Sequence, residues 1–505
     1  MDFLSCLVCL CLCFASTWFL IQTLHGRPSR VRLPPGPKPY PLVGNLFELG
    51  DKPHISLTKL SQHYGPIISL KLGQVTTVVV SSSTMAKEIL RTHDQFLCNR
   101  AIPDALRAIG DYSLPWLPVS SRWRNLRKIC NSQLFAIKVL DANQANRRAK
   151  VQELIASVND SMVKGTAVNI GEVAFRTSLN LLSRTIFSVD LADTNSSSST
   201  NEMAREFKEI VWGVLEEAGK PNLGDYFPVL KKIDPQGIRR RFTNNYNKML
   251  GFIESVINQR LKSRNEDAYV TSNDMLDTLI NISEEKNEED VNLPLVFEHL
   301  FVALFVAGTD TTSTTLEWAM AELLHNPESL SKAQQELDQM IGKGKPIEES
   351  DITRLPYLQA IIKETFRLHP PVPLLLPRKA DSDIEMEGYI VPNGAQVLVN
   401  AWAIGRDPSI WDNPSSFMPE RFFGLDNQID VMGKNFELIP FGGGRRICPG
   451  LPLAMRMLHL MLGSLINCFD WKLEDGVVPE TMHMEDKFGL TLQMAQPLKA
   501  VPKKL

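Results

Sequence analysis

One cysteine sits in a setting that could give it metal chemistry. Residues 441–450 read Phe-Gly-Gly-Gly-Arg-Arg-Ile-Cys-Pro-Gly, and an apolar helical pattern begins at Leu451. Backbone amides and the dipole at a helix start favour a thiolate at Cys448, and a thiolate can ligate iron. A buried, inert thiol is the other interpretation. A phosphate-binding loop is excluded because the stretch has neither a P-loop lysine nor GxGxxG spacing.

A second group of candidate residues lies in a long helical pattern over 293–324, which a following Asn-Pro pair should end. Its centre, 307–312, reads Ala-Gly-Thr-Asp-Thr-Thr, although glycine, an acid and threonines are poor choices for packing within a helix. The small residues would let a bulky group approach, and Asp310 and Thr311 could handle protons. The residues at helical spacing are Leu300, Ala303, Leu304, Ala307, Gly308 and Thr311.

Three further stretches place charged or aromatic residues at short intervals: Glu364-Thr-Phe-Arg367, Pro419-Glu-Arg-Phe422 and Trp123-Arg-Asn-Leu-Arg127. Taken singly, the Glu/Arg pair reads as a surface pair one helical turn apart, Trp123 as a core aromatic, and Asp310 as a solvated acid. Because these patterns all occur in one chain, it is improbable that they arose together by chance.

Together these residues resemble the cytochrome P-450 family. The FxxGxRxCxG haem signature of that family matches Phe441, Gly444, Arg446, Cys448 and Gly450. The other stretches are similar to its ExxR, PERF and WxxxR motifs in the right order, and 307–312 is similar to its oxygen-activating helix motif. The resemblance covers essentially the whole chain and implies a mainly α fold with small β-sheets.

The resemblance also implies a role for each matching residue. Cys448 would be the axial ligand of the iron of haem b, and Thr311 and Asp310 would organise water and deliver protons during oxygen activation. Glu364, Arg367 and Arg421 would form a buried structural charge triad. The haem-binding residues would be Cys448, Phe441, Gly444, Arg446, Gly450, Trp123, Arg127, Arg378, Ala307 and Gly308, with Trp123 and the arginines at the propionates.

Finer resemblance points to plant microsomal enzymes of the terpenoid-hydroxylase group that contains geraniol 8-hydroxylase and linalool oxidases. It rests on phrases such as LPPGPKPYPLVGNLFELGDKPH and FELIPFGGGRRICPGLPLA. The segments expected to line the substrate cavity are apolar, namely 102–116, 300–305, 372–376 and 489–492. We therefore expect a monooxygenase for a terpenoid, with successive oxidation at one carbon left open. A phenolic or aromatic amino-acid hydroxylase and a non-catalytic haem-binding sensor or carrier are the alternatives.

Electrons should come from NADPH through a separate NADPH–cytochrome P-450 reductase, because no flavin-binding module follows Cys448. The candidate basic contacts for this partner are Arg122, Arg124, Lys128 and Arg445. O2 and a lipophilic small molecule complete the expected partners.

The elements that position these residues begin with an apolar run over residues 3–21, which is long enough to span a bilayer. Basic residues follow the run, so we expect a retained anchor over 1–25 rather than a cleaved signal peptide. A basic and proline-rich hinge over 26–44 and a catalytic domain over 45–505 would follow. This predicts a single-pass protein of the endoplasmic reticulum membrane with its catalytic domain in the cytosol.

The rest of the chain is predicted to be mainly helical, most clearly between about 120 and 370. Two β-hairpins are expected, at 67–80 and at 389–399, and the loop 226–230 is a candidate membrane contact. The 505 residues carry a formal net charge of −3, which argues against a nucleic-acid partner. Scattered cysteines indicate a reducing compartment rather than disulfides.

Overall fold

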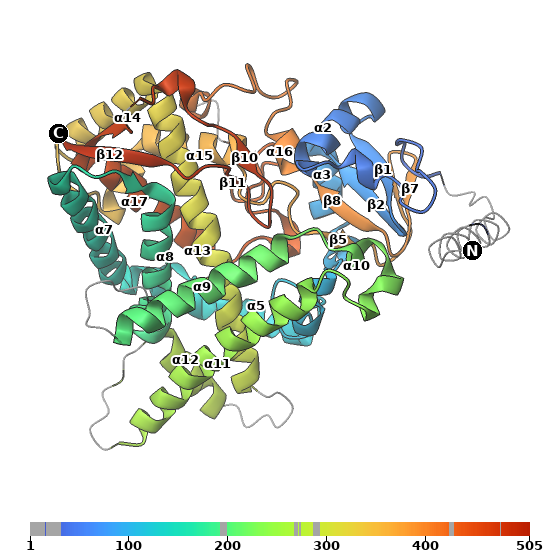
Figure 1. Cartoon of the computed structure of the whole chain (residues 1–505), viewed down its shortest axis with the longest axis horizontal. Helices are drawn as coiled ribbons and strands as arrows, with labels where there is room; N and C mark the ends of the chain where they lie inside the picture. The colour runs from blue at the N-terminus through green and yellow to red at the C-terminus, as the bar shows by residue number, and fades with distance from the viewer. Residues whose placement is uncertain are drawn as a thin grey trace, which may run out of the picture.

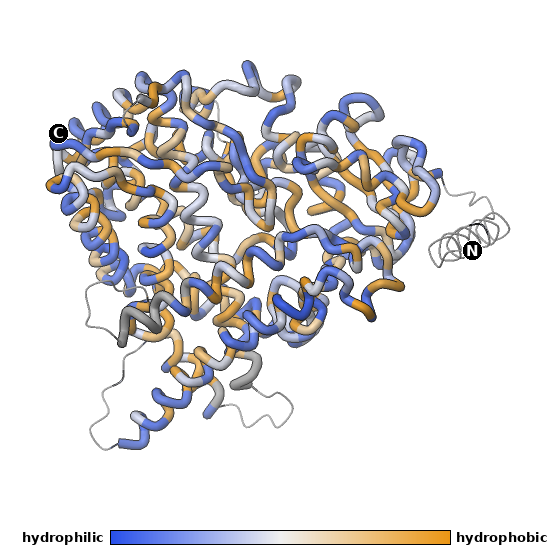
Figure 2. The backbone as a smooth tube through the Cα atoms, in the orientation of Figure 1, coloured by the Kyte–Doolittle hydropathy of each residue, from blue (hydrophilic) through white to orange (hydrophobic). Residues whose placement is uncertain are grey.

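The computed structural model describes residues 32–191, 199–266, 274–285, 293–423, 429–474 and 476–505, together with Ser16 and Thr271. The described chain is mainly helical with small sheets, as the sequence predicts. A large helical region, which includes the C-terminus, adjoins a smaller region built around a five-stranded sheet (Figure 1). Figure 2 shows apolar stretches in the strands of the sheet and along the interior helices.

The longer helices have well-defined bounds. They are α2 (Pro53–Tyr64), α5 (Ser121–Ile129), α7 (Gln144–Lys164), α8 (Ile170–Phe187), α9 (Ser199–Gly219), α11 (Ile238–Arg264), α12 (Met275–Glu285), α13 (Leu293–His325), α14 (Pro327–Met340), α15 (Pro356–Leu368) and α17 (Leu451–Cys468). Shorter helical segments used below are α10 (Leu223–Tyr226), η5 (Pro228–Lys232), η7 (Pro419–Phe422) and η8 (Gly444–Arg446).

The long helix α13 crosses the middle of the molecule, as its 33 apolar-rich residues require (Figure 1). It ends at His325, immediately before the predicted Asn-Pro stop. It packs most extensively against α8, and the approach is close at Gly308, where an added Cβ would lie 2.8 Å from Leu182 Cδ1. Gly308 at the centre of α13 is therefore needed for the close packing of α13 against α8, in addition to any space that it leaves for a ligand.

The main sheet has the strand order β1-β2-β8-β5-β3. Its strands are β1 (Ile67–Leu72), β2 (Val75–Val80), β3 (Asn99–Arg100), β5 (Arg378–Lys379) and β8 (Gln396–Val399). Strands β1 and β2 pair as the predicted hairpin over 67–80, whereas β8 joins β2 in parallel and β5 antiparallel. The sheet thus brings Arg378 and Arg100 into direct register.

The expected hairpin at 389–399 is wrong. Strand β7 (Tyr389–Val391) pairs with the preceding β6 (Ile384–Met386), and β8 lies in the main sheet. The chain does turn at Gly394, whose φ is +79°, but Gly394 N–H donates to the Ala380 carbonyl rather than closing a hairpin. The turn signal was correct and the strand partner was not.

The remaining strands form small sheets. Strands β4 (Val168–Asn169), β12 (Lys499–Lys504) and β9 (Phe469–Leu473) make one, and β10 (Asp486–Lys487) pairs with β11 (Gln493–Met494) in another. The loop between β10 and β11, residues 488–492, is anchored by the N–H of Leu492, which donates to the Pro371 carbonyl.

The predicted anchor over 1–25 lies outside the described residues apart from Ser16, and so does the first part of the predicted hinge. From residue 34 onward the proline-rich segment packs on the sheet, because Ser69 N–H donates to the Pro35 carbonyl at 2.8 Å. Among the described residues, α17 has the length and apolarity to cross a membrane, but it is a mostly buried core helix.

Candidate functional site

The loop that carries Cys448 is tightly folded. Gly444 has φ +67°, and a Cβ there would lie 2.0 Å from the Leu90 carbonyl oxygen, so only glycine fits. The N–H of Cys448 donates to the Phe441 carbonyl at 3.0 Å, which closes the turn just before α17. Cys448 lies deep in the molecule, yet its side chain is accessible because it lines an internal cavity.

The electrostatics of this thiol combine two opposite effects. Burial raises the pKa of Cys448, whereas the N–H groups of Gly450 and Leu451 and the guanidinium of Arg127 lower it. The predicted helix-start amides therefore do point at the sulfur, but for the free thiol burial outweighs them. Binding of a cation would reverse that balance.

The cavity beside Cys448 has a volume of about 360 Å³ and is lined mostly by apolar side chains. Every residue of the predicted α13 stripe lines it. Part of each predicted cavity segment lines it too: Leu106, Ile109, Ser113, Leu114, Pro115 and Trp116; Leu300, Val302, Ala303 and Leu304; Val372, Leu375 and Leu376; and Leu490 and Thr491. A thiol at one wall of an apolar cavity suits a large hydrophobic group that carries a metal.

Arginines gather at one part of this cavity. Arg378 and Arg446 both line it; Arg446 donates to the carbonyls of Cys98, Leu114 and Leu117 and lies over the Trp123 ring at 4.7 Å. Arg378 donates to Asp94 at 3.1 Å and to the Gly443 carbonyl at 3.3 Å. The structure thus brings these predicted residues together, and Arg127 also lines the cavity.

Arg100 joins this group, although it belongs to none of the sequence motifs. Burial lowers the pKa of Arg100 well below its usual value, and the neighbouring Arg378 and Arg446 act in the same direction, with only partial compensation from Asp94. Three crowded guanidinium groups favour an anionic ligand. The carboxylates of a haem would fit this cluster, just as Cys448 would fit its iron.

The polar residues at the centre of α13 face two different regions of the molecule. Thr311 lines the cavity, and its Oγ1 donates to the Ala307 carbonyl one turn earlier at 2.7 Å. Asp310 is buried instead against the C-terminal segment, where it accepts from the Thr491 hydroxyl and from Gln493 Nε2 at 2.9 Å. Burial raises the pKa of Asp310, and these hydrogen bonds offset part of the effect.

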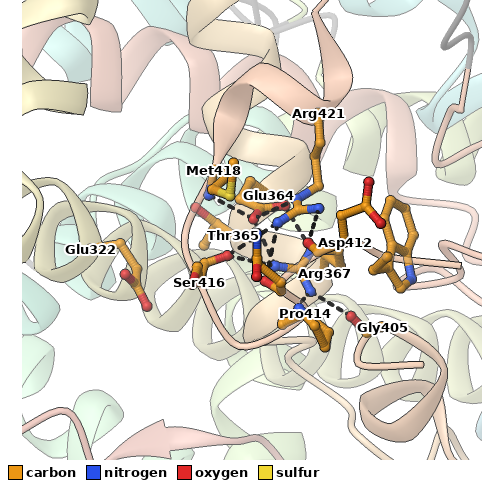
Figure 3. A network of polar contacts seen from close by, with 12 residues as sticks. Glu322, Glu364, Thr365, Arg367, Gly405, Asp412, Pro414, Ser416, Met418 and Arg421 are labelled. Atoms are coloured by element: carbon orange, nitrogen blue, oxygen red, sulfur yellow. Dashed lines mark hydrogen bonds and ion pairs between the residues drawn. The ribbon is translucent and has the colours of Figure 1, made fainter. Parts of the chain in front are cut away.

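The predicted charge triad is assembled between α15, which carries Glu364 and Arg367, and η7, which carries Arg421 (Figure 3). Glu364 accepts two hydrogen bonds from Arg367, both at 2.7 Å, and one from Arg421 Nε at 3.0 Å. Arg367 also donates to the carbonyls of Gly405, Pro414 and Ser416. Glu364 and Arg367 are fully buried, so the triad ties α15 to η7 and to the segment between them.

Sequence reasoning missed two more polar residues of the cavity wall. Tyr246 of α11 lines the cavity and shares a hydrogen bond with His299 of α13. Ser178 of α8 also lines it, and its buried hydroxyl has no partner among the described residues. Neither belongs to a recognisable motif; only the packing of α8, α11 and α13 places them.

Comparison with known proteins agrees with this geometry. Residues 34–498 match the cytochrome P450 family. The chain is 54% identical to a geraniol 8-hydroxylase of Catharanthus roseus over the whole of both chains. It is 50% identical to a drimenol monooxygenase of Persicaria hydropiper, covering 99% of this chain and 97% of that one. It is 51% identical to a geranylhydroquinone 3''-hydroxylase of Arnebia euchroma over 96% of each.

A thiol, an arginine cluster and an apolar cavity occur together in a chain whose likeness extends from residue 34 to residue 498. The chain belongs to the cytochrome P450 family, and this membership gives it a monooxygenase activity, haem b as cofactor, and electrons from NADPH through a reductase.

Proposed function

We propose that this protein hydroxylates a terpenoid. The observation that carries the proposal is the cavity, which begins at Cys448 and continues between apolar side chains of α8, α11 and α13. Such walls suit a hydrocarbon skeleton and offer few polar groups to hold it. The three relatives act, by their names, on geraniol, drimenol and geranylhydroquinone, which are isoprenoid compounds that carry hydroxyl groups.

Within that function Cys448 would hold the haem iron through its sulfur, and Phe441, Gly444 and Gly450 shape the loop that presents this sulfur. Arg100, Arg378 and Arg446 would hold the propionates of the haem, with Trp123 and Arg127 beside them. All five residues line the same cavity, which supports this assignment. Ala307 and Gly308 line the cavity and would leave room beside a bound haem. The bound haem supplies activation of O2, which no side chain of the protein provides.

The proton chemistry falls to Thr311 and Asp310. Thr311 lies on the cavity wall, where its hydroxyl can exchange the Ala307 carbonyl for a water in the cavity. Asp310 is linked to the cavity wall through Thr491, a lining residue whose hydroxyl donates to the Asp310 carboxylate. Its raised pKa suits a group that both gives and takes protons.

The reductase is proposed to dock on the basic surface formed by α5 and η8. Arg124, Lys128 and Arg445 are exposed there, and Arg122 is half-buried over the Tyr112 ring. Arg446 of η8 stacks on Trp123 of α5, which shows that the two elements adjoin. Because the same elements hold the Cys448 region, electrons delivered at this surface have a short path.

We further propose that the protein is held in the endoplasmic reticulum membrane by residues 1–25, with the catalytic domain in the cytosol. A second contact is the predicted loop 226–230 together with the nearby Ile233; Val229 and Ile233 are 66% and 70% exposed. The β1–β2 turn binds this loop, since Gln74 N–H donates to the Tyr226 carbonyl at 2.8 Å. Core packing does not explain such exposure.

The test of the function uses microsomes that contain the full-length protein and a reductase, incubated with terpene and phenolic panels. We expect NADPH-dependent hydroxylated terpenoids and none from Cys448→Ala. Products from the phenolic panel alone would replace the terpenoid assignment with a phenolic one. NADPH-independent haem binding without any oxygenated product would instead favour a sensor or carrier.

A further inference from the structure

A tyrosine–histidine pair adds a polar group to the mostly apolar cavity wall. The hydroxyl of Tyr246 on α11 lies 2.7 Å from Nδ1 of His299 on α13. Both side chains are buried, 3% and 5% exposed, and Tyr246 lines the cavity. Tyr112 stacks on the His299 ring at 4.9 Å, and Phe242 stacks on Tyr246 at 5.7 Å, so the pair is held in place on both sides.

The charge states of Tyr246 and His299 decide which of them donates the hydrogen bond and which accepts it. Burial lowers the pKa of His299 to about 4, and burial raises the pKa of Tyr246, so both groups are neutral near pH 7. A neutral imidazole has one bare nitrogen that accepts a hydrogen bond, and a phenol is a good donor. With Tyr246 donating to His299 Nδ1, the phenolic oxygen keeps its lone pairs for another donor.

The pair also lies at a useful distance from the oxygen-activating segment. His299 precedes Ala307 by two turns of α13, which corresponds to about 12 Å along the helix axis. Leu300, Ala303 and Leu304, which are apolar, line the cavity between them. That separation is comparable with the length of an extended acyclic monoterpenol.

We propose that Tyr246, oriented by His299, accepts a hydrogen bond from the hydroxyl group of a terpenoid alcohol and so directs the far end of the molecule toward Ala307–Thr311. Tyr246 is then a specificity-determining residue, and His299 is a positioning residue that acts through it. This inference rests on the proposed terpenoid function and narrows its substrates to isoprenoids with a hydroxyl remote from the oxidised carbon.

The experiment compares geraniol with geranyl methyl ether, which keeps the oxygen but has no hydrogen to donate. Binding is measured by the substrate-induced spectral shift of the ferric haem in full-length protein. Tyr246→Phe keeps the ring and its stack on Phe242, so we expect geraniol to bind roughly 3- to 10-fold more weakly. Binding of the methyl ether should not change, and the hydroxylation of geraniol should spread over more carbons.

Two further variants separate this role from a structural one. His299→Asn keeps an acceptor for the phenol and should retain the preference for the alcohol over the ether. Tyr112→Phe removes a hydroxyl from the other side of His299, outside the cavity wall, and should behave as the unchanged protein.

An equal effect of Tyr246→Phe on alcohol and ether, or no effect on either, would overturn the anchor and leave the pair as a brace between α11 and α13. The terpenoid function would survive that outcome. Failure of the unchanged protein to bind or oxidise any terpenoid would instead remove the function itself.

Discussion

Thr311 is the residue whose two roles are hardest to separate, because its hydroxyl both lines the cavity and back-bonds to the helix at Ala307. If only the back-bond matters, Thr311→Ala is near neutral, since alanine is the better helix former. We expect instead that the variant binds haem and substrate but wastes electrons. NADPH consumption should persist with less product and more hydrogen peroxide.

The matched control for this prediction is Thr315→Ala. Thr315 makes the same back-bond one turn later, to the Thr311 carbonyl at 2.8 Å, but it does not line the cavity. Its loss should leave the product formed per NADPH unchanged, and Thr311→Ser should recover much of the coupling. An unchanged ratio in Thr311→Ala would return this threonine to a structural role.

At the scale of single residues, sequence motifs identified those site residues that lie close to one another along the chain. Cys448, Arg446 and Trp123 lie within short patterns, and the structure gathers them at one cavity. Arg100 and Tyr246 could not be found this way. Arg100 reaches the arginine cluster only because β3 pairs with β5, and Tyr246 reaches the cavity only because α11 packs near α13.

At the scale of elements, the Glu364 triad holds α15 against η7 and the preceding segment (Figure 3). In Glu364→Ala two buried guanidinium groups lose their carboxylate, which should cost roughly 3–5 kcal/mol. We expect the variant to accumulate poorly and to hold little haem, measured by the ratio of haem to protein after purification.

The control is Glu328→Ala, which removes an 84% exposed carboxylate from a surface pair with Lys332. Exposed pairs contribute little, so this variant should match the unchanged protein. Abundant, haem-loaded Glu364→Ala would show that the triad is not required for folding.

A second prediction at this scale concerns Glu317, which joins α13 to the segment before β12 by accepting a hydrogen bond from Leu498 N–H at 2.9 Å. Burial raises the pKa of Glu317 from 4.5 to about 7. A carboxyl with a raised folded-state pKa stabilises the fold most below its unfolded value, and this contribution is lost as pH rises through about 7.

The variant Glu317→Gln keeps the acceptor but not the titration. Its melting temperature should therefore fall less than that of the unchanged protein between pH 4.5 and about 7. If the melting temperatures of the two proteins fall equally as the pH rises across that window, Glu317 does not titrate there.

The elements also show what a local pattern can and cannot predict. The hairpin β1–β2 was predictable because its turn joins adjacent partners. The second predicted hairpin failed because β8 prefers partners distant in sequence, β2 and β5, which a local alternation of residues does not reveal. The long α13 was predictable because its apolar period continues to a clear stop.

At the scale of the whole molecule, the catalytic body and the membrane contacts are proposed to be separable. Deleting residues 1–25 should weaken membrane association and leave haem binding intact, since the described residues that line the cavity all lie between Arg100 and Thr491. Fractionation of membranes and soluble material, with haem absorbance in each, measures both properties.

Some of the truncated protein should stay on membranes through the loop 226–230 and Ile233. Replacing Val229 and Ile233 by serine in the truncated protein should release this remainder, because both side chains are largely exposed. Complete loss of haem on truncation would contradict the separation of anchor and catalytic domain.

The central claim is that Cys448 supplies the thiolate of a haem-thiolate monooxygenase, and the ferrous–CO spectrum tests it most directly. Cys130 is the matched control, because it is a buried thiol near enough to interact electrostatically with Cys448. We predict the red-shifted Soret band of thiolate ligation in the unchanged protein and in Cys130→Ala, and its loss in Cys448→Ala. Survival of the band in Cys448→Ala, or its loss in Cys130→Ala alone, would contradict the account.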